Sequence, residues 1–175
     1  MEYNPIKHHR RSIRLRDYDY SSAGAYFVTI CAYKKECVFG DIIDGQMMLN
    51  SAGKSVYNSW QWLEEQYDHV ELDQFIVMPN HLHGIICIND VCGRGGSRTA
   101  PTMKQKPLGR LIGAFKTVST KQTNIICHAS GNQLWQRNYY ENIIRNEESL
   151  NRIRDYIQNN PIKWELDEYN PSKFL

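Results

Sequence analysis

The chain has 175 residues, of which 41% are hydrophobic and 23% charged, and its formal net charge is only +2. This length suits one domain with a single core, and the composition excludes an intrinsically disordered chain. The longest apolar runs are strand-sized, no apolar signal segment opens the chain, and the five cysteines form no CxxC pair. These features argue against a transmembrane helix, a secreted disulfide framework and a zinc knuckle, so we expect one cytoplasmic domain over residues 1–175.

Basic residues are concentrated in two segments that contain no acidic residue. The first is KHHRRSIRLR, residues 7–16, within an expected basic N-terminal arm over 1–24. The second stretch, 91–140, has eight lysines or arginines and begins with a Gly, Ser, Thr and Arg-rich segment that we expect to be a flexible basic linker over 91–106. Such segregation is typical of a surface that contacts phosphates. For residues 91–106 a solvated loop is an equal alternative.

After the arm, residues 25–33 (AYFVTICAY) are typical of a buried strand. The Asp44-Gly45 pair between two short apolar runs predicts a tight hairpin within residues 37–50. The spacing of Val56, Trp60 and Leu63 then predicts a helix over 51–66, capped by Asn50 or Ser51.

Two further strands are expected over residues 69–79 and 81–88, joined by a turn at Pro79-Asn80. Because side chains alternate along a strand, His81 and His83 share one face, while Leu82 and Gly84 point to the other.

Pro107 opens an expected helix over 108–124 with an apolar face, and residues 134–144 are predicted to form one or two short strands. The last helix is capped by Asn146, carries Glu147 and Glu148 in its first turn, and ends at Pro161. The main elements reduce to βαββαβ with one additional helix. We therefore expect an α+β, ferredoxin-like (split βαβ) antiparallel sheet with helices on one face and a C-terminal helix carrying Tyr156.

The HLH triplet at residues 81–83 offers two imidazoles on one rigid strand. Neutral imidazole binds Mn²⁺ and Zn²⁺, and an added oxygen ligand makes a site that also accepts Mg²⁺. The alternative is a polar strand end that is hydrogen-bonded locally. Strand context favours the metal site but does not decide between the two.

Tyr156 and Asn160 are four residues apart, so on a helix they lie one above the other. Tyr156 borders an apolar face formed by Leu150, Ile153 and Ile157, which also fits a core tyrosine with an exposed hydroxyl. Asn160 could supply an amide oxygen to the metal, although the following proline is expected to push it out of helical geometry. A tyrosine beside a metal site is a candidate nucleophile for attack on phosphate. Tyr139 and Tyr140 are alternatives to Tyr156 for that role.

From about Arg10 to Trp164 the chain resembles the single-tyrosine HUH transposases, and more closely their REP-associated tyrosine transposase branch. The resemblance is carried by RRSIRLRDYDYSSAGAYFVTI, VFGDI, VMPNHLHGIICI, LIGAFKTVSTK and LWQRNYYENIIRNEESLNRIRDYIQNNPIKW. It implies that His81, His83 and Asn160 hold Mg²⁺ or Mn²⁺ and that Tyr156 is the nucleophile. The Gly and Arg-rich insert over 92–107 departs from the family pattern.

The function implied by this resemblance is nicking and joining of single-stranded DNA next to hairpins, through a covalent 5′-phosphotyrosine. Partners are then single-stranded or hairpin DNA and no membrane, and a homodimer and a monomer both remain open. Basic and aromatic side chains are expected to contact DNA. They are Arg10, Arg11, Arg14, Lys116, Trp135, Arg137, Tyr140, Arg145 and Arg152.

Two rival functions remain open at this point. A non-catalytic RNA-recognition-like module would share the ferredoxin-like sheet and its aromatic and basic residues. A two-histidine phosphoesterase needs a second H-x-S or H-x-T motif, for which His128 and Ser130 are a weak match. The first pair, H-x-H, lacks the hydroxyl residue of that motif, so we rank this rival below the transposase.

Overall fold

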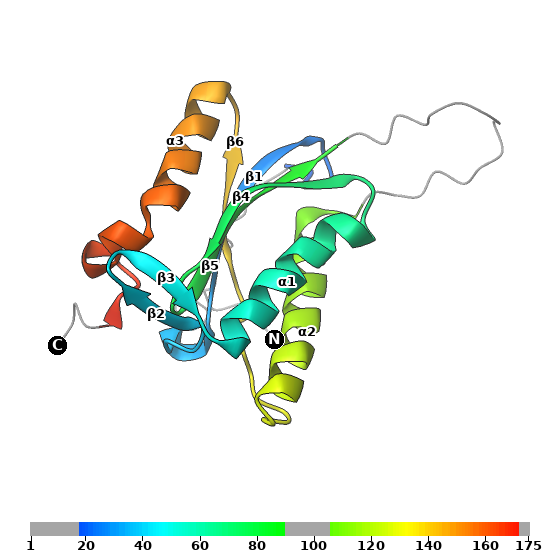
Figure 1. Cartoon of the computed structure of the whole chain (residues 1–175). Helices are drawn as coiled ribbons and strands as arrows, with labels where there is room; N and C mark the ends of the chain where they lie inside the picture. Colours follow the sequence, from blue (N-terminus) through cyan, green and yellow to red (C-terminus); the bar gives the residue numbers. More distant parts are fainter. Residues whose placement is uncertain (1–17, 90–105, 172–175) are drawn as a thin grey trace, which may run out of the picture.

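The computed structural model describes residues 18–89 and 106–171. Most of the expected basic arm and nearly all of the expected linker therefore lie outside the described residues. The described chain folds into an antiparallel sheet, a separate hairpin, three α-helices and two short 3₁₀ segments (Figure 1). None of its helices has the length and apolar content needed to span a membrane.

The elements follow the predicted order closely. The strands are β1 Gly24–Cys31, β2 Gly40–Ile43, β3 Gln46–Leu49, β4 Val70–Val77, β5 His81–Ile88 and β6 Tyr140–Ile144. The helices are α1 Ser51–Gln66, α2 Leu108–Ile126 and α3 Glu147–Asn159, and the 3₁₀ segments are η1 Tyr33–Lys35 and η2 Pro161–Leu166.

The sheet confirms the predicted ferredoxin-like topology. Its strand order is β4-β5-β1-β6, so the first and third main strands, β1 and β5, are central. In the antiparallel pairing of these two strands, Thr29 lies opposite His83 and Cys31 lies opposite His81. The two histidines therefore occupy the middle of the sheet.

The hydrophobic core fills the space between one face of the sheet and the helices α1 and α2. Alternation along β5 directs Leu82 and Ile86 into this core and leaves His81 and His83 on the opposite face. Trp60 of α1 lies directly over Gly84, where an added Cβ would come within 2.5 Å of the indole ring. The core is built mainly from Tyr26, Val28, Ile30, Val56, Trp60, Leu63, Leu82, Ile86, Leu108, Leu111, Ile112 and Phe115.

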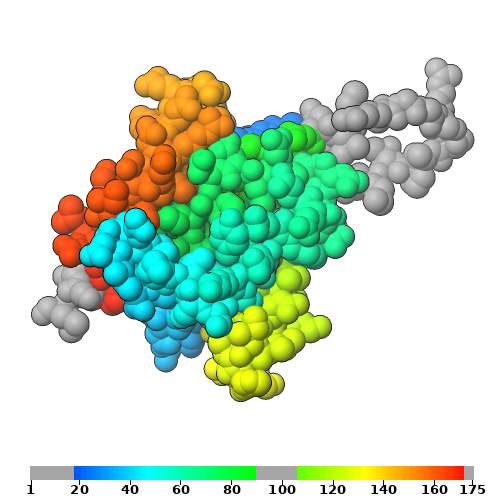
Figure 2. Space-filling model, in the orientation of Figure 1, coloured from blue at the N-terminus to red at the C-terminus, as the bar shows by residue number. Residues whose placement is uncertain are grey.

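The predicted hairpin forms at Asp44-Gly45, whose φ angles are 51° and 72°. Positive φ at both central residues is what a type I′ turn requires, and Asp-Gly is a preferred pair for it. The hairpin packs against the C-terminal segment, with Ile162 of η2 next to the position where a Cβ on Gly45 would lie. Figure 2 shows this contact as the cyan hairpin beside the orange and red end of the chain.

Helix α3 lies on the sheet face opposite α1 and α2 (Figure 1). Its N-cap Asn146 accepts a hydrogen bond from the Ser149 amide at 2.8 Å, as predicted. Only Ile157 of this helix is fully buried. A bidentate ion pair ties the helix to β4, with Arg154 Nε 2.9 Å from Asp73 Oδ1 and Nη2 2.5 Å from Oδ2.

Asn160 keeps helical geometry, with φ −60° and ψ −43°, so the expectation that Pro161 displaces it was wrong. Its carbonyl accepts a hydrogen bond from Lys163, because η2 continues directly from α3. Asn160 is 2% exposed, so the end of α3 is held in place by packing.

Substitution of Gly84 by alanine tests the close contact between β5 and α1. Because the new Cβ would meet a rigid indole ring, we expect the free energy of unfolding to fall by about 1–3 kcal/mol in urea titrations. The control is Gly113→Ala on α2, where no atom lies within 4 Å of an added Cβ. There alanine should raise stability by roughly 0.5–1 kcal/mol. Equal effects of the two substitutions would contradict the packing described.

Candidate functional site

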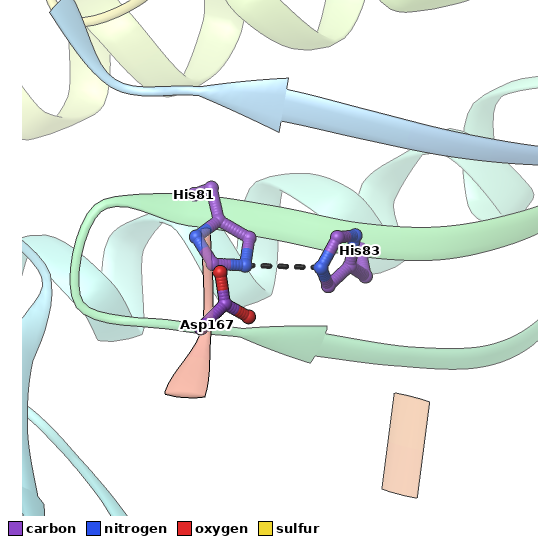
Figure 3. A group of neighbouring side chains, drawn as sticks. All are labelled: His81, His83 and Asp167. Carbon is purple, nitrogen blue, oxygen red and sulfur yellow. Dashed lines mark hydrogen bonds between the residues drawn. The ribbon is translucent and has the colours of Figure 1, made fainter. Parts of the chain in front are cut away.

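The two histidines of β5 point their Nε2 atoms at each other. These atoms are 3.0 Å apart, and the side chains of His81 and His83 are 0% and 1% exposed. Figure 3 shows both imidazoles on β5 with the Asp167 carboxylate beside them. A spacing of 3.0 Å matches that of two neighbouring ligands around an octahedral ion with bonds of about 2.1 Å. The alternation of side chains along β5 that the sequence predicts is therefore present, and the Nε2 atoms of both imidazoles point to one position.

Asn80 fixes the protonation of His81. Its Nδ2 donates to the carbonyls of Lys35 and Tyr169, at 2.9 and 2.7 Å, so its Oδ1 must face His81 Nδ1 at 2.8 Å. An amide oxygen can only accept, so His81 carries its proton on Nδ1. Its Nε2 then has a free lone pair, which is the form that binds a cation.

Thr29 plays the corresponding role for His83. Its hydroxyl lies 2.8 Å from His83 Nδ1, across the β1–β5 pairing. A hydroxyl can donate or accept. His83 Nε2 can thus carry a proton toward His81 in the ion-free protein, or lose it and act as a second ligand while Nδ1–H donates to Thr29.

Burial keeps both imidazoles neutral. Desolvation lowers the pKa of His83 to about 3, and desolvation together with the neighbouring His83 and Lys35 lowers the pKa of His81 well below its usual value. Neutral imidazole is the form that coordinates a metal. At neutral pH both imidazoles are therefore in the form that can coordinate a cation.

Tyr156 lies next to the histidine pair. Its hydroxyl is 3.2 Å from His83 Nε2, and its ring meets Phe27 edge-on. The side chain is 42% exposed and borders a pocket of about 360 Å³ that opens to solvent. Burial and the charge of Asp167 raise the pKa of Tyr156, while a hydrogen bond with Asn160 opposes that rise. The predicted tyrosine is therefore beside the predicted ligands, with its hydroxyl protonated at neutral pH.

Two oxygen donors complete the cluster. Asp167, at the end of η2, lies with the histidines so that one ligand atom from each falls within 4.8 Å of the others. Asn160 Nδ2 donates to Asp167 Oδ2 at 3.3 Å, while Asn160 Oδ1 is buried without a hydrogen-bond partner. An orphaned buried acceptor costs about 1–3 kcal/mol, which a bound cation would offset. Two imidazoles, a carboxylate and an amide oxygen are a donor set that fits a divalent ion.

Two residues expected to contact DNA have other roles. Trp135 is 4% exposed, packs against Phe39 and Phe115, and donates its indole N–H to Ser119 at 2.8 Å. Its rings therefore offer no face to a base, which corrects the expectation of stacking.

Lys116 is half-buried and is occupied by contacts within the protein. Its ammonium donates to the carbonyls of Gln136, Arg137 and Asn138 at 2.8, 3.3 and 2.9 Å, and burial lowers its pKa to about 8. These contacts use its three protons and hold the loop before β6, so the expectation of a phosphate contact is not supported.

The remaining expected DNA contacts divide into two groups. Arg137, Arg145 and Arg152 are exposed, and Tyr140 is 55% exposed and lines the same pocket as Tyr156. Arg10, Arg11 and Arg14 lie outside the described residues.

The described residues do not bring His128 next to His81 and His83, as a two-histidine phosphoesterase would require. His128 follows α2, which covers the sheet face opposite the one that carries His81 and His83. It is exposed and separated from the pair by the sheet.

A scan against protein-family models found no match. A protein of Haemophilus influenzae, described only as uncharacterized, is 45% identical over 175 residues, which cover 95% of this chain and 96% of that protein. This chain belongs to the family of that protein. The description of the relative assigns no activity to the family.

The fold is shared with a solved REP-associated tyrosine transposase, whose structure contains a bound REP hairpin. The TM-score is 0.57 with 17% sequence identity, and the match covers 89% of this chain and 76% of that one. This likeness confirms the fold that the resemblance implied.

The depressed pKa values of the histidines predict acid sensitivity of the metal-free protein. The imidazoles of the unfolded chain take up protons near pH 6.5, whereas in the folded protein the pKa of His83 is about 3 and that of His81 is well below its usual value. Stability is therefore complete above about pH 6.5 and falls as pH drops below it. The expected slope is about 1.4 kcal/mol per pH unit for each histidine that titrates. Urea titrations in a chelator at pH 7.5 and 5.0 measure it.

In this comparison His83→Gln should show a smaller loss between the two pH values than the wild type. The control His128→Gln changes an exposed histidine and should keep the wild-type loss. A His83→Gln variant with the full wild-type loss would show that burial of this imidazole does not govern the acid response.

Proposed function

We propose that this protein is a metal-dependent transposase of the single-tyrosine HUH type, which cuts single-stranded DNA next to a hairpin and joins strands through a 5′-phosphotyrosine. The observation that carries the proposal is the 3.2 Å distance from the Tyr156 hydroxyl to His83 Nε2, one of two converging imidazole nitrogens. A nucleophile, two neutral nitrogen ligands and two oxygen donors meet there. The hairpin bound by the structural neighbour supports hairpin DNA as the partner.

His81, His83, Asp167 and Asn160 would hold Mg²⁺ or Mn²⁺. A divalent ion bound there would polarise the scissile phosphate and stabilise the leaving oxygen. Burial and the Asp167 carboxylate raise the pKa of the Tyr156 phenol. Positive charge held by these ligands would offset the effect of the carboxylate and favour the phenolate.

In the proposed reaction the Tyr156 oxygen attacks phosphorus. A Tyr156 O–P bond forms at the 5′-phosphate of the strand downstream of the cut as the P–O3′ bond to the upstream strand breaks. The phenolic proton passes to solvent at the exposed side of the pocket, and the departing oxygen gains a proton as a free 3′-hydroxyl. The phosphotyrosine ester keeps the bond energy for rejoining, which suits strand transfer better than degradation. Exposed Arg137, Arg145 and Arg152 would contact phosphates, and Tyr140 would stack on an unpaired base.

An RNA-recognition-like module is not favoured. Such a domain reads bases with aromatic side chains on its sheet. The centre of this sheet face instead carries two buried histidines with fixed hydrogen-bond partners. Passive RNA binding requires neither of them.

A covalent adduct tests the proposed reaction. The protein is incubated in Mn²⁺ with a labelled pool of hairpin-bearing single strands with randomised flanks, and adducts are resolved on a denaturing gel. The wild type should form an adduct that Tyr156→Phe abolishes, whereas Tyr57→Phe on α1 should form it normally. No adduct with any strand of the pool, or an adduct that persists in Tyr156→Phe, would contradict the mechanism.

Metal binding tests the ligand set without DNA. Titration with Mn²⁺, followed by the loss of the free-ion electron paramagnetic resonance signal, should give one site per chain. His83→Gln should abolish binding, and Asp167→Asn should weaken it by roughly 10–100-fold. Asp155→Asn, an exposed residue of α3, should bind as the wild type does. Wild-type affinity in Asp167→Asn would remove this carboxylate from the ligand set.

A further inference from the structure

The turn after β1 carries two consecutive lysines in left-handed conformation. Lys34 has φ 55° and Lys35 has φ 59°. Each costs on the order of 1–2 kcal/mol for a residue with a Cβ, and persists only where surrounding contacts impose it. Asn80 supplies one such contact, because its Nδ2 donates to the Lys35 carbonyl at 2.9 Å. The same amide orients His81, so the strained turn and the histidine pair are held by one side chain.

This geometry directs the Lys35 side chain to the pocket of about 360 Å³ that Tyr156 borders. The Lys35 ammonium lies 4.7 Å from the centre of the Tyr169 ring, and that ring lies 4.7 Å from the ring of His81. Lys35 lines the pocket together with His83 and Tyr156 and is the one lysine or arginine among its described lining residues. Lys34 instead places its ammonium 5.4 Å from the Tyr33 ring and does not line this pocket.

The pocket needs a cation if a phosphate is to enter it. Glu168 lines it, and Asp167 lies within the adjoining cluster. A phosphodiester carries one negative charge, and attack by a phenolate adds a second in the transition state. Carboxylates nearby would repel that charge, most strongly where water is partly excluded.

We propose that Lys35 binds a non-bridging oxygen of the scissile phosphate and stabilises the charge that develops there when Tyr156 attacks. The proposal rests on the proposed function and adds to it a catalytic cation outside the metal cluster. Lys35 transfers no proton in this step, and no covalent bond to it forms or breaks. Its contact with the Tyr169 ring holds it at the pocket before DNA arrives.

Adjacent lysines provide a matched pair of variants. Lys35→Met and Lys34→Met each remove one charge, and each keeps a Cβ at a position of nearly the same positive φ, so their effects on backbone strain should be alike. The probe is a hairpin-bearing strand that forms the adduct with the wild type. Under single-turnover conditions in Mn²⁺, Lys35→Met should form the adduct about 10²–10³ times more slowly, whereas Lys34→Met should stay within about twofold of the wild type. Lys35→Arg, which keeps the charge, should recover most of the rate.

A substrate with a methylphosphonate at the cut site separates catalysis from structure. This group lacks one charged oxygen, so the wild type should react slowly and Lys35→Met should lose little more. An equal loss on both substrates, or equal rates for Lys35→Met and Lys34→Met on normal DNA, would overturn the proposal. If the wild type forms no adduct with any strand, both the proposed function and this inference fail. Normal adduct formation by Lys35→Met would refute the inference alone.

Discussion

The position of α3 on the sheet governs the whole candidate site. This helix buries one side chain fully, Ile157, so apolar packing alone holds it weakly. Its register is set by the two parallel hydrogen bonds from Arg154 to Asp73, which sits where the β4 register shifts between Leu72 and Phe75. Bulges of this kind re-aim a side chain out of the regular ladder. The guanidinium also holds the pKa of Asp73 below its usual value.

Because Arg154 is 37% exposed, the ion pair contributes about 1 kcal/mol or less to stability. The ion pair matters because it fixes where α3 lies on the sheet. Tyr156 is two residues after Arg154, and Asn160 lies one turn beyond Tyr156. The chain then continues without a break through η2 to Asp167. One anchored helix and the η2 segment that continues from it thus bring Tyr156, the proposed nucleophile, together with Asn160 and Asp167, to the histidines of β5.

The sheet separates two kinds of buried surface. On the α1–α2 face, burial is apolar and stabilises the fold. On the α3 face, His81 and His83 are equally buried but each has a defined hydrogen-bond partner, Asn80 and Thr29. Satisfied polar groups of this kind are stable in a protein interior, and their fixed orientation directs both Nε2 atoms to one point, 3.0 Å apart. Strand alternation in β5 creates both surfaces from eight residues.

Local periodicity explains what could be predicted from the sequence. Alternation placed His81 and His83 on one face, and helical spacing placed Asn160 beside Tyr156. Asp167 was missed because it follows Pro161 in a short 3₁₀ segment with no periodic pattern, and its approach to His81 depends on how the chain folds back. Burial of Trp135 was missed for a similar reason. Trp135 pairs with Ala32 through a single β-bridge outside any strand, so the sequence around it has no periodic pattern that predicts burial.

The left-handed lysines had no sequence signal at all. Lys-Lys has no preference for positive φ, and only the contact from Asn80, 45 positions away along the chain, reveals the constraint. The resemblance to a known family supplied the roles of the ligands and the nucleophile. The structure added the carboxylate, the hydrogen bonds that set the imidazole protonation, and the cation at the pocket.

Peptide mapping of the covalent adduct tests the central claim most directly. After nuclease trimming, trypsin should release residues 155–163, in which Tyr156 is the single tyrosine, and residues 138–145, which contain Tyr139 and Tyr140. The account predicts that mass spectrometry will find the nucleotide remnant on the peptide 155–163. A remnant on 138–145, or on any other tyrosine peptide, would show that the phenol beside His83 is not the nucleophile.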